Sequence, residues 1–267
     1  MTKIIVTGAT GRMGSRIIAL TKDYKDITLA GAVERQGHEG IGKDVGQLIG
    51  AGEMKVALAG GLEEVIEKGD VIVDFTSTEA TLRHVRLAVE KRRAIVIGTT
   101  GLSKEDMESV WAAGRQIPIV QAPNMSVGVN LLLKVLGDVA RVLGDDYDIE
   151  IVEAHHRLKK DAPSGTAMKM AQVIAAAVNR DLDEVAVYAR KGLIGERTKK
   201  EIGIQTVRAG DIVGEHTVLF GGLGERIEIT HKASSRDTFA RGALKAAVWL
   251  HGKPAGFYDM QDVLGLK

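Results

Sequence analysis

The first half of the chain alternates short runs of β-branched and apolar residues with helical stretches, and this alternation limits the possible folds most strongly. Runs such as KIIVTG, DVIVDF and AIVIGT are almost continuously apolar, as expected for strands of a parallel sheet buried on both faces. Right-handed crossovers place helices on both faces of such a sheet. We therefore predict an α/β fold that begins with a Rossmann-like, doubly wound parallel sheet. The expected strands are Ile4 to Val6, Leu29 to Val33, Val56 to Leu58, Val71 to Phe75, Ile95 to Ile97 and Ile119 to Val120.

The pattern changes from Val127 onward, where strands begin to outnumber helices. An amphipathic helix leads into a strand from Asp148 to Ala154, a polar loop, and a second helix from about Thr166 to Val178. Four later segments alternate apolar and polar residues between glycine-bearing turns, namely EVAVYAR, IGIQTVRAG, HTVLFGG and ERIEITHKA. They predict a second, α+β domain with an open mixed sheet that has one exposed face.

The last part of the chain returns to helix, with apolar residues at helical spacing from Phe239 to Val248 and an end expected before Pro254. We expect this helix to pack on the first domain. Residues 1–126 and 237–267 then form one domain, and residues 127–236 form another. The two connections between them would act as hinges.

Composition excludes several classes of function. Lys plus Arg (36) nearly balance Asp plus Glu (35), so no overall field attracts nucleic acid or an anionic membrane, and any anion must be bound locally. No apolar run approaches the roughly 20 residues that cross a bilayer. With no cysteine, the chain has neither disulfides nor a cysteine nucleophile. The first residues enter a strand pattern without the features of a secretory signal, so we expect a cytoplasmic protein.

A glycine-rich loop follows the first expected strand. Gly8-Ala9-Thr10-Gly11-Arg12-Met13-Gly14 precedes the helical IIALTKD, and such glycines let backbone amides approach a pyrophosphate. Glu34 comes 20 residues after Gly14 at the end of the second strand, where a carboxylate can bind ribose hydroxyls. Arg35 favours the 2′-phosphate of NADP, whereas Glu34 disfavours it, so the cofactor preference stays open. The spacing is GxxGxxG, and the Gly-Lys-Ser/Thr ending of a triphosphate-binding loop is absent.

Two further segments follow strands at the edge where doubly wound sheets bind ligands. The first is Gly98-Thr99-Thr100, which an ordinary turn before a capped helix would also explain. The second is Ala122-Pro123-Asn124-Met125, which is equally compatible with a simple linker to the second domain. We predict that both segments line a dinucleotide site.

A basic cluster in the second domain carries the strongest chemical signal. Five of the six residues from His155 to Lys160 are basic, and they lie between an apolar strand and Pro-Ser-Gly-Thr at a helix start. A solvated charged loop is the alternative, but cations beside free helix amides favour a small substrate with more than one carboxylate. No third ligand stands at metal spacing from His155 and His156, so we predict no metal site. His155 and Lys159 are both credible proton donors, and geometry must decide between them.

These motifs resemble the bacterial 4-hydroxy-tetrahydrodipicolinate reductase family, also called dihydrodipicolinate reductases, over essentially the whole length. The segment EAHHRLKKDAPSGTA from Glu153 is far more specific than the glycine loop. Some relatives carry another histidine where this chain has Leu158. The other motifs are GATGRMG at 8–14, VER at 33–35, VDFT at 73–76, VIGTTG at 96–101, NMSVGVN at 124–130, VRAGDIVGEH from Val207 and ITHKASSRDTFA from Ile229.

The resemblance implies roles for individual residues. His155 would be the proton donor or acceptor, Lys159 the proton donor, and His156, Gly165 and Thr166 substrate-binding positions. The implied cofactor contacts are Gly8, Ala9, Thr10, Gly11, Arg12, Met13, Glu34, Arg35, Gly98, Thr99, Thr100, Ala122, Pro123, Asn124 and Met125. Residues 1–126 with 237–267 would then bind the dinucleotide, and residues 127–236 would bind substrate and mediate oligomerisation.

The resemblance also implies a reaction. A small cyclic dicarboxylate would be reduced by NADH, NADPH or both, with loss of water, in the diaminopimelate route to lysine. The second domain's sheet would assemble a homotetramer. Aspartate semialdehyde dehydrogenase has a similar outline but needs a cysteine nucleophile, which this chain lacks. A dinucleotide-sensing binding protein would not need the basic cluster, and cofactor turnover distinguishes the two.

Overall fold

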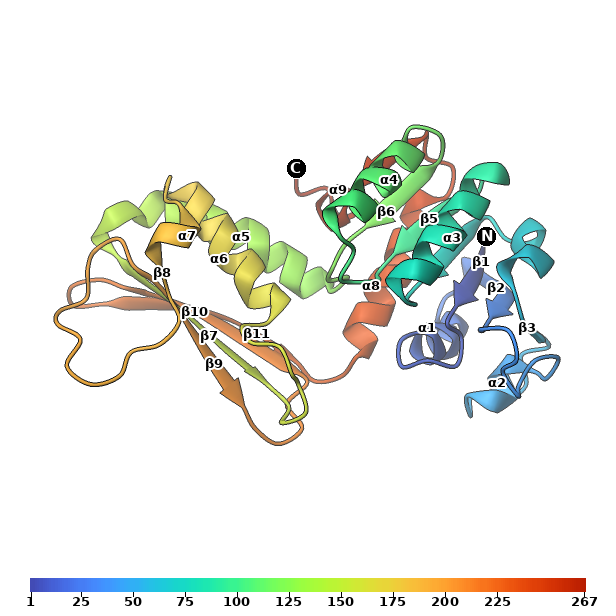
Figure 1. Ribbon diagram of the computed structural model, residues 1–267, viewed down its shortest axis with the longest axis horizontal. Coiled ribbons are helices and arrows are strands. Elements are labelled where there is room, and N and C mark those ends of the chain that lie inside the picture. Colours follow the sequence, from blue (N-terminus) through green and yellow to red (C-terminus); the bar gives the residue numbers. More distant parts are fainter. The chain divides into compact units, whose positions relative to one another are not determined.

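The computed structural model describes residues 1–267, which divide into two compact units (Figure 1). Unit 1 contains Met1–Val127 and Arg236–Lys267, and unit 2 contains Gly128–Ser235. No helix is both long and apolar enough to span a membrane.

The sheet of unit 1 has seven parallel strands in the order β12-β6-β5-β4-β1-β2-β3. The order reverses between β1 and β4, so their carboxyl ends flank the position where a doubly wound sheet binds its ligand. The predicted Rossmann-like sheet is confirmed. Its strands are β1 (Thr2–Thr7), β2 (Ile27–Val33), β3 (Leu58–Ala59), β4 (Val71–Asp74), β5 (Ala94–Ile97), β6 (Pro118–Gln121) and β12 (Gly256–Tyr258).

Helices cover both faces of this sheet, which explains why its strands are continuously apolar. On one face, Ile4, Val6 and Val73 pack with α1 (Gly14–Leu20) and α8 (Asp237–Leu250) in one buried cluster. On the other face, Ile5 and Ile72 pack with α3 (Thr78–Glu90) and α4 (Lys104–Gly114). Successive side chains of one strand therefore enter different cores. The shorter helices of unit 1 are α2 (Val45–Leu48), α9 (Met260–Leu264), η1 (Thr21–Asp23), η2 (Leu62–Glu64) and η3 (Ile66–Lys68).

Two details of unit 1 differ from the sequence prediction. The strand expected from Val56 to Leu58 is limited to Leu58–Ala59, because Asp44 holds the preceding segment as a loop by accepting hydrogen bonds from the amides of Met54 and Val56. The edge strand β12 was not predicted, since its three residues show no alternation long enough to detect.

Unit 2 has a five-stranded mixed sheet in the order β11-β10-β7-β9-β8. The strands are β7 (Asp148–His155), β8 (Ala186–Val187), β9 (Ile202–Arg208), β10 (Gly214–Gly221) and β11 (Arg226–Ala233). The helices of this unit are α5 (Val127–Leu143), α6 (Gly165–Ala177), α7 (Leu182–Val185) and the short η4 (Gly144–Asp146). Strands β7, β9 and β10 share one apolar core with α5 and α6, which lie on one face of the sheet in Figure 1. The other face exposes side chains such as Val152 and Val207, so the predicted open mixed sheet is confirmed.

The strand expected from Glu184 to Arg190 is wrong over most of its length. Asp181 caps a helical turn up to Val185, and only Ala186 and Val187 pair with β9. Arg190 leaves the sheet because its guanidinium forms ion pairs with Glu150 at 2.8 Å and with Glu201 at 3.0 Å. Long-range ion pairs of this kind have no local sequence pattern.

Candidate functional site

The glycine-rich loop of unit 1 turns tightly at the carboxyl end of β1. Gly8 has a positive φ of 65°, and its carbonyl oxygen accepts a hydrogen bond of 3.0 Å from the amide of Gly11. A Cβ on Gly14 would lie only 2.1 Å from the Gly8 oxygen, so this position requires glycine. The N–H groups of Arg12 and Met13 donate to no atom of the chain, which suits a loop that binds an anion.

The carboxylate of Glu34 lies against this loop. Its Oε2 accepts hydrogen bonds from the Thr10 hydroxyl at 2.8 Å and the Thr10 amide at 3.3 Å, and its Oε1 accepts one from the Arg35 amide at 3.0 Å. Burial opposes ionisation, but these hydrogen bonds outweigh it and lower the pKa of Glu34. A fixed, ionised carboxylate at this edge is the group that binds ribose hydroxyls in dinucleotide sites. Arg35 is exposed beside it.

The turn Gly98-Thr99-Thr100 lies at the end of β5, beside a polar network that sequence reasoning missed. The fully buried carboxylate of Asp74 accepts hydrogen bonds from Thr76, Thr81 and Thr99 and contacts His84 Nδ1 at 2.8 Å. Thr99 also accepts a hydrogen bond of 3.0 Å from the Thr76 amide. The network therefore holds the ends of β4 and β5 together. The sequence signals for it were a polar residue at the end of an apolar strand and the motif VDFT at 73–76.

The segment Ala122 to Met125 leaves the end of β6. The amide of Ala122 donates to the Ile97 carbonyl at 3.2 Å, and Asn124 Oδ1 accepts from the Ser126 amide at 2.9 Å. Ala122 and Met125 are buried, whereas Pro123 is exposed. The loop at 8–13, Glu34, the turn at 98–100 and this segment all follow carboxyl ends of strands in one sheet, as predicted for a dinucleotide site.

In unit 2, His155 ends β7 with its ring held by a buried carboxylate. Its Nδ1 lies 2.5 Å from Glu153 Oε2, and Glu153 is fully buried. Burial lowers the pKa of His155, and the hydrogen bond that its ring donates to Glu153 raises it without reversing the shift. Residues two apart on a strand point to the same face, so this pairing follows from local geometry. A histidine held in this way can accept or donate a proton near neutral pH.

The other predicted residues of unit 2 lie in the loop after β7 and at the start of α6. Lys159 Nζ contacts both carboxylate oxygens of Asp161, at 2.9 and 2.8 Å. Ser164 caps α6 by accepting a hydrogen bond from the Ala167 amide at 3.2 Å. Gly165 and Thr166 form the first turn of α6, the end of a helix that favours an anion. His156 follows β7, and its buried Nδ1 has no hydrogen-bond partner.

A second histidine, His216 on β10, was not predicted as part of this site. Its ring packs edge-on against His155 with 5.2 Å between centroids, and its Nε2 lies 3.0 Å from the Ser164 hydroxyl. Burial, with the nearby charge of His155, lowers the pKa of His216 to about 4. His216 is therefore neutral at ordinary pH and shares one hydrogen bond with the Ser164 hydroxyl.

This shifted pKa makes the stability of the fold depend on pH. Between about pH 6.5 and pH 4, His216 is protonated in the unfolded chain but not in the folded chain. The free energy of unfolding is therefore highest above pH 6.5 and decreases as the pH falls through this range. The pKa shift of His216 changes the free energy of unfolding by about 3 kcal/mol over the whole range. We expect His216→Gln to lose less unfolding free energy than the wild type between pH 7 and pH 4.5 in urea titrations. Identical losses in both proteins would contradict the assignment.

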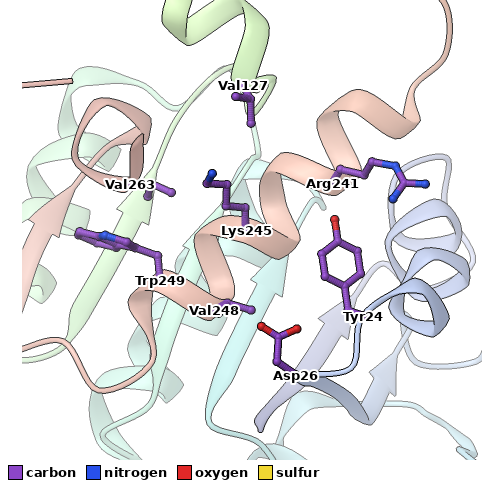
Figure 2. Close-up of a pocket in the computed structure, with 8 residues that line it drawn as sticks. All are labelled: Tyr24, Asp26, Val127, Arg241, Lys245, Val248, Trp249 and Val263. Carbon is purple, nitrogen blue, oxygen red and sulfur yellow. The ribbon is translucent and has the colours of Figure 1, made fainter. Parts of the chain in front are cut away.

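A cavity of about 440 Å³ in unit 1 is lined by none of the predicted cofactor residues (Figure 2). Its lining includes Lys245, Val248 and Trp249 of α8 together with Tyr24 and Asp26, all labelled in Figure 2. Tyr24 and Asp26 precede β2, whereas the predicted cofactor residues follow the carboxyl ends of their strands. This cavity is therefore not the predicted dinucleotide site.

Comparison with known proteins identifies the family. The family model for the N-terminus of dihydrodipicolinate reductase matches residues 2–125, and the model for its C-terminus matches residues 128–264. The chain belongs to the dihydrodipicolinate reductase family. The C-terminal family model thus includes α8, which packs within unit 1.

Relatives within this family match from end to end. The 4-hydroxy-tetrahydrodipicolinate reductase of Syntrophus aciditrophicus (strain SB) is 57% identical over 267 residues, and that of Geobacter sulfurreducens is 55% identical, each with 100% of both chains covered. A dipicolinate-bound dihydrodipicolinate reductase from Paenisporosarcina sp. TG-14 superposes with a TM-score of 0.74 at 25% identity, over 98% of both chains. An amine dehydrogenase from Mycobacterium smegmatis, at 13% identity and a TM-score of 0.60, shares the fold over 96% of this chain and 94% of its own. The resemblance seen in the sequence is confirmed.

Proposed function

We infer that the chain reduces 4-hydroxy-tetrahydrodipicolinate to tetrahydrodipicolinate, with loss of water, in the diaminopimelate route to lysine. The observation that carries this inference is 57% identity over the full length to a protein named for that reaction. The dipicolinate bound to the structure from Paenisporosarcina sp. TG-14 is a cyclic dicarboxylate, as is the proposed substrate. The chain is thus an oxidoreductase that acts on a CH or CH2 group.

The residues of unit 1 fit a nicotinamide dinucleotide. The tight approach of Gly14 to Gly8 leaves the loop backbone open to a pyrophosphate, and Glu34 is fixed where it can accept hydrogen bonds from a ribose. Residues 8–13, 34–35, 98–100 and 122–125 would hold the cofactor, which supplies the hydride when bound. NADH and NADPH are both compatible with the pair Glu34 and Arg35.

The residues of unit 2 supply binding and proton transfer. The first turn of α6 binds one substrate carboxylate through Gly165 and Thr166, Lys159 adds positive charge, and His156 offers its ring for a further substrate contact. Lys159 donates the proton that completes the reduction, and His155 donates or accepts a proton through the ring nitrogen that Glu153 does not hold. Local cations are needed because the whole chain has almost no net charge.

Turnover with each nucleotide tests the inference. We expect the purified protein to oxidise NADH, NADPH or both in the presence of substrate made in situ from pyruvate and aspartate semialdehyde by the preceding synthase. His155→Ala should lower kcat roughly 100-fold or more, because a positioned acid or base is lost, and should leave nucleotide binding intact. Nucleotide absorbance and a binding titration measure the two effects. A folded wild type that binds nucleotide without turning over would support the dinucleotide-sensing alternative.

Two further properties stay predictions. The homotetramer, expected to form through the open sheet of unit 2, is checked by light scattering of the full chain. The cytoplasmic location is checked by fractionation of cells that produce the protein.

A further inference from the structure

The carboxylate of Glu153 joins three separate segments of unit 2. Its Oε1 accepts hydrogen bonds from the Ser164 amide at 3.0 Å, the Thr206 hydroxyl at 3.2 Å and Arg208 Nη2 at 2.8 Å. Its Oε2 accepts from Arg208 Nη1 at 2.9 Å and from His155 Nδ1 at 2.5 Å. The side chain is fully buried, so these five donors replace the water that an exposed carboxylate would have.

Strand register creates this arrangement. Glu153 pairs with Thr206 on β9 and with His216 on β10, and the next residue on the same face, His155, pairs with Arg208. The groups therefore form two adjacent rows on the face of the sheet that also contacts α6. Gly214 on β10 leaves room for the imidazole, because a Cβ there would lie 3.1 Å from His155 Nε2.

We propose that Glu153 is a positioning residue for the reaction inferred above, on which this proposal rests. One carboxylate oxygen holds the ring of His155, and the other holds the amide of Ser164, one residue before the turn that binds the substrate carboxylate. The proton-transfer group and the anion-binding turn are thus fixed relative to each other. Glu153 also places the proton of neutral His155 on Nδ1 and leaves Nε2 for the substrate.

Arg208 makes a buried carboxylate compatible with an anionic substrate. Its two Nη atoms pair with Glu153, and Nη2 also donates to the Asp161 carbonyl at 2.7 Å, which ties the loop of Lys159 to β9. Without this cation, Glu153 would repel a dicarboxylate. Burial opposes ionisation of Glu153, but the bonds from Arg208 and His155 dominate and lower its pKa. The pair therefore remains ionised.

Glu153→Gln tests the proposal because it keeps the size of the side chain and removes its charge. The charged and titratable groups around His155 are Glu153 on β7, Arg208 on β9, His216 on β10 and Lys159 in the loop, and only Glu153 raises the pKa of His155. We expect kcat to fall about 100-fold in Glu153→Gln. We also expect the apparent pKa that His155 contributes to the pH profile of kcat to move to lower pH. In Glu153→Asp this apparent pKa should stay closer to the wild-type value, since aspartate retains the charge.

Glu150→Gln is the matched control, because Glu150 lies on the same strand and also pairs with an arginine, Arg190, at 2.8 Å, but on the opposite face. Glu150→Gln should leave both kcat and its pH profile unchanged. NMR of the His155 imidazole, recorded without substrate, gives a readout that does not depend on turnover. The proposal is supported if the wild type shows the Nδ1–H tautomer and if the pKa of His155 is lower in Glu153→Gln. An unchanged titration of His155 in Glu153→Gln overturns it. Absence of turnover in the wild type overturns only the reaction inferred above.

Discussion

Lys159→Ala is expected to lower kcat roughly 100- to 10,000-fold, whereas Lys160→Ala should leave it nearly unchanged. Both lysines belong to the same basic cluster, but Lys159 is largely covered beside Asp161 and Lys160 is exposed. The two variants therefore remove the same charge from neighbouring positions, and only one removes the proposed proton donor. Steady-state turnover with saturating nucleotide measures the difference.

In the proposed reaction Lys159 would exchange Asp161 for substrate, and the ion pair that it would give up is weak. Asp161 keeps 66% of its side chain exposed, and ion pairs in such surroundings contribute only about 0–1 kcal/mol. The hydrogen bond from Lys159 lowers the pKa of Asp161, so Asp161 is ionised before substrate arrives. Equal losses of activity in Lys159→Ala and Lys160→Ala would contradict a specific proton donor and indicate that the cluster acts through its total charge.

Gly242→Ala is expected to destabilise the fold of unit 1 by about 3 kcal/mol or more, because a methyl group there meets backbone that cannot move aside. Gly242 lies in the middle of α8, and an added Cβ would lie 1.7 Å from the carbonyl oxygen of Met125. Relief would require α8 to move away from the segment that follows β6. Urea denaturation followed by circular dichroism measures the loss.

Gly137→Ala in α5 is the matched control, since it places the same methyl group in the middle of another helix. Its closest contact is Val173 Cγ1 at 3.4 Å, an ordinary van der Waals distance. Alanine is the better helix former, so this variant should be more stable than the wild type by up to about 1 kcal/mol. Destabilisation of the two variants by the same amount would show that the close approach of α8 to Met125 is not the cause.

The hydrophobic pattern of the sequence predicted those helices and strands that are long or that are buried on both faces. Strands such as Val71–Asp74 and Ala94–Ile97 were found from their continuous apolar runs, and α8 from its helical spacing. The pattern failed where a distant side chain decides the backbone. Asp44 keeps residues 54–57 out of a strand, and the ion pairs of Arg190 remove residues after Val187 from the sheet.

The features of the proposed site also fall into two groups, those that the sequence predicted and those that only the structure shows. The sequence by itself determined the family, the doubly wound sheet with its glycine turn, and the cluster from His155 to Lys160, because these depend on residues close together in the chain. Only the tertiary structure decided that Glu153 is shared by His155, Ser164 and Arg208 and that His216 packs beside them. The contacts with Arg208 and His216 depend on the register of β7, β9 and β10, in which paired residues lie up to 73 positions apart in the sequence and no single strand shows a pattern that reveals it.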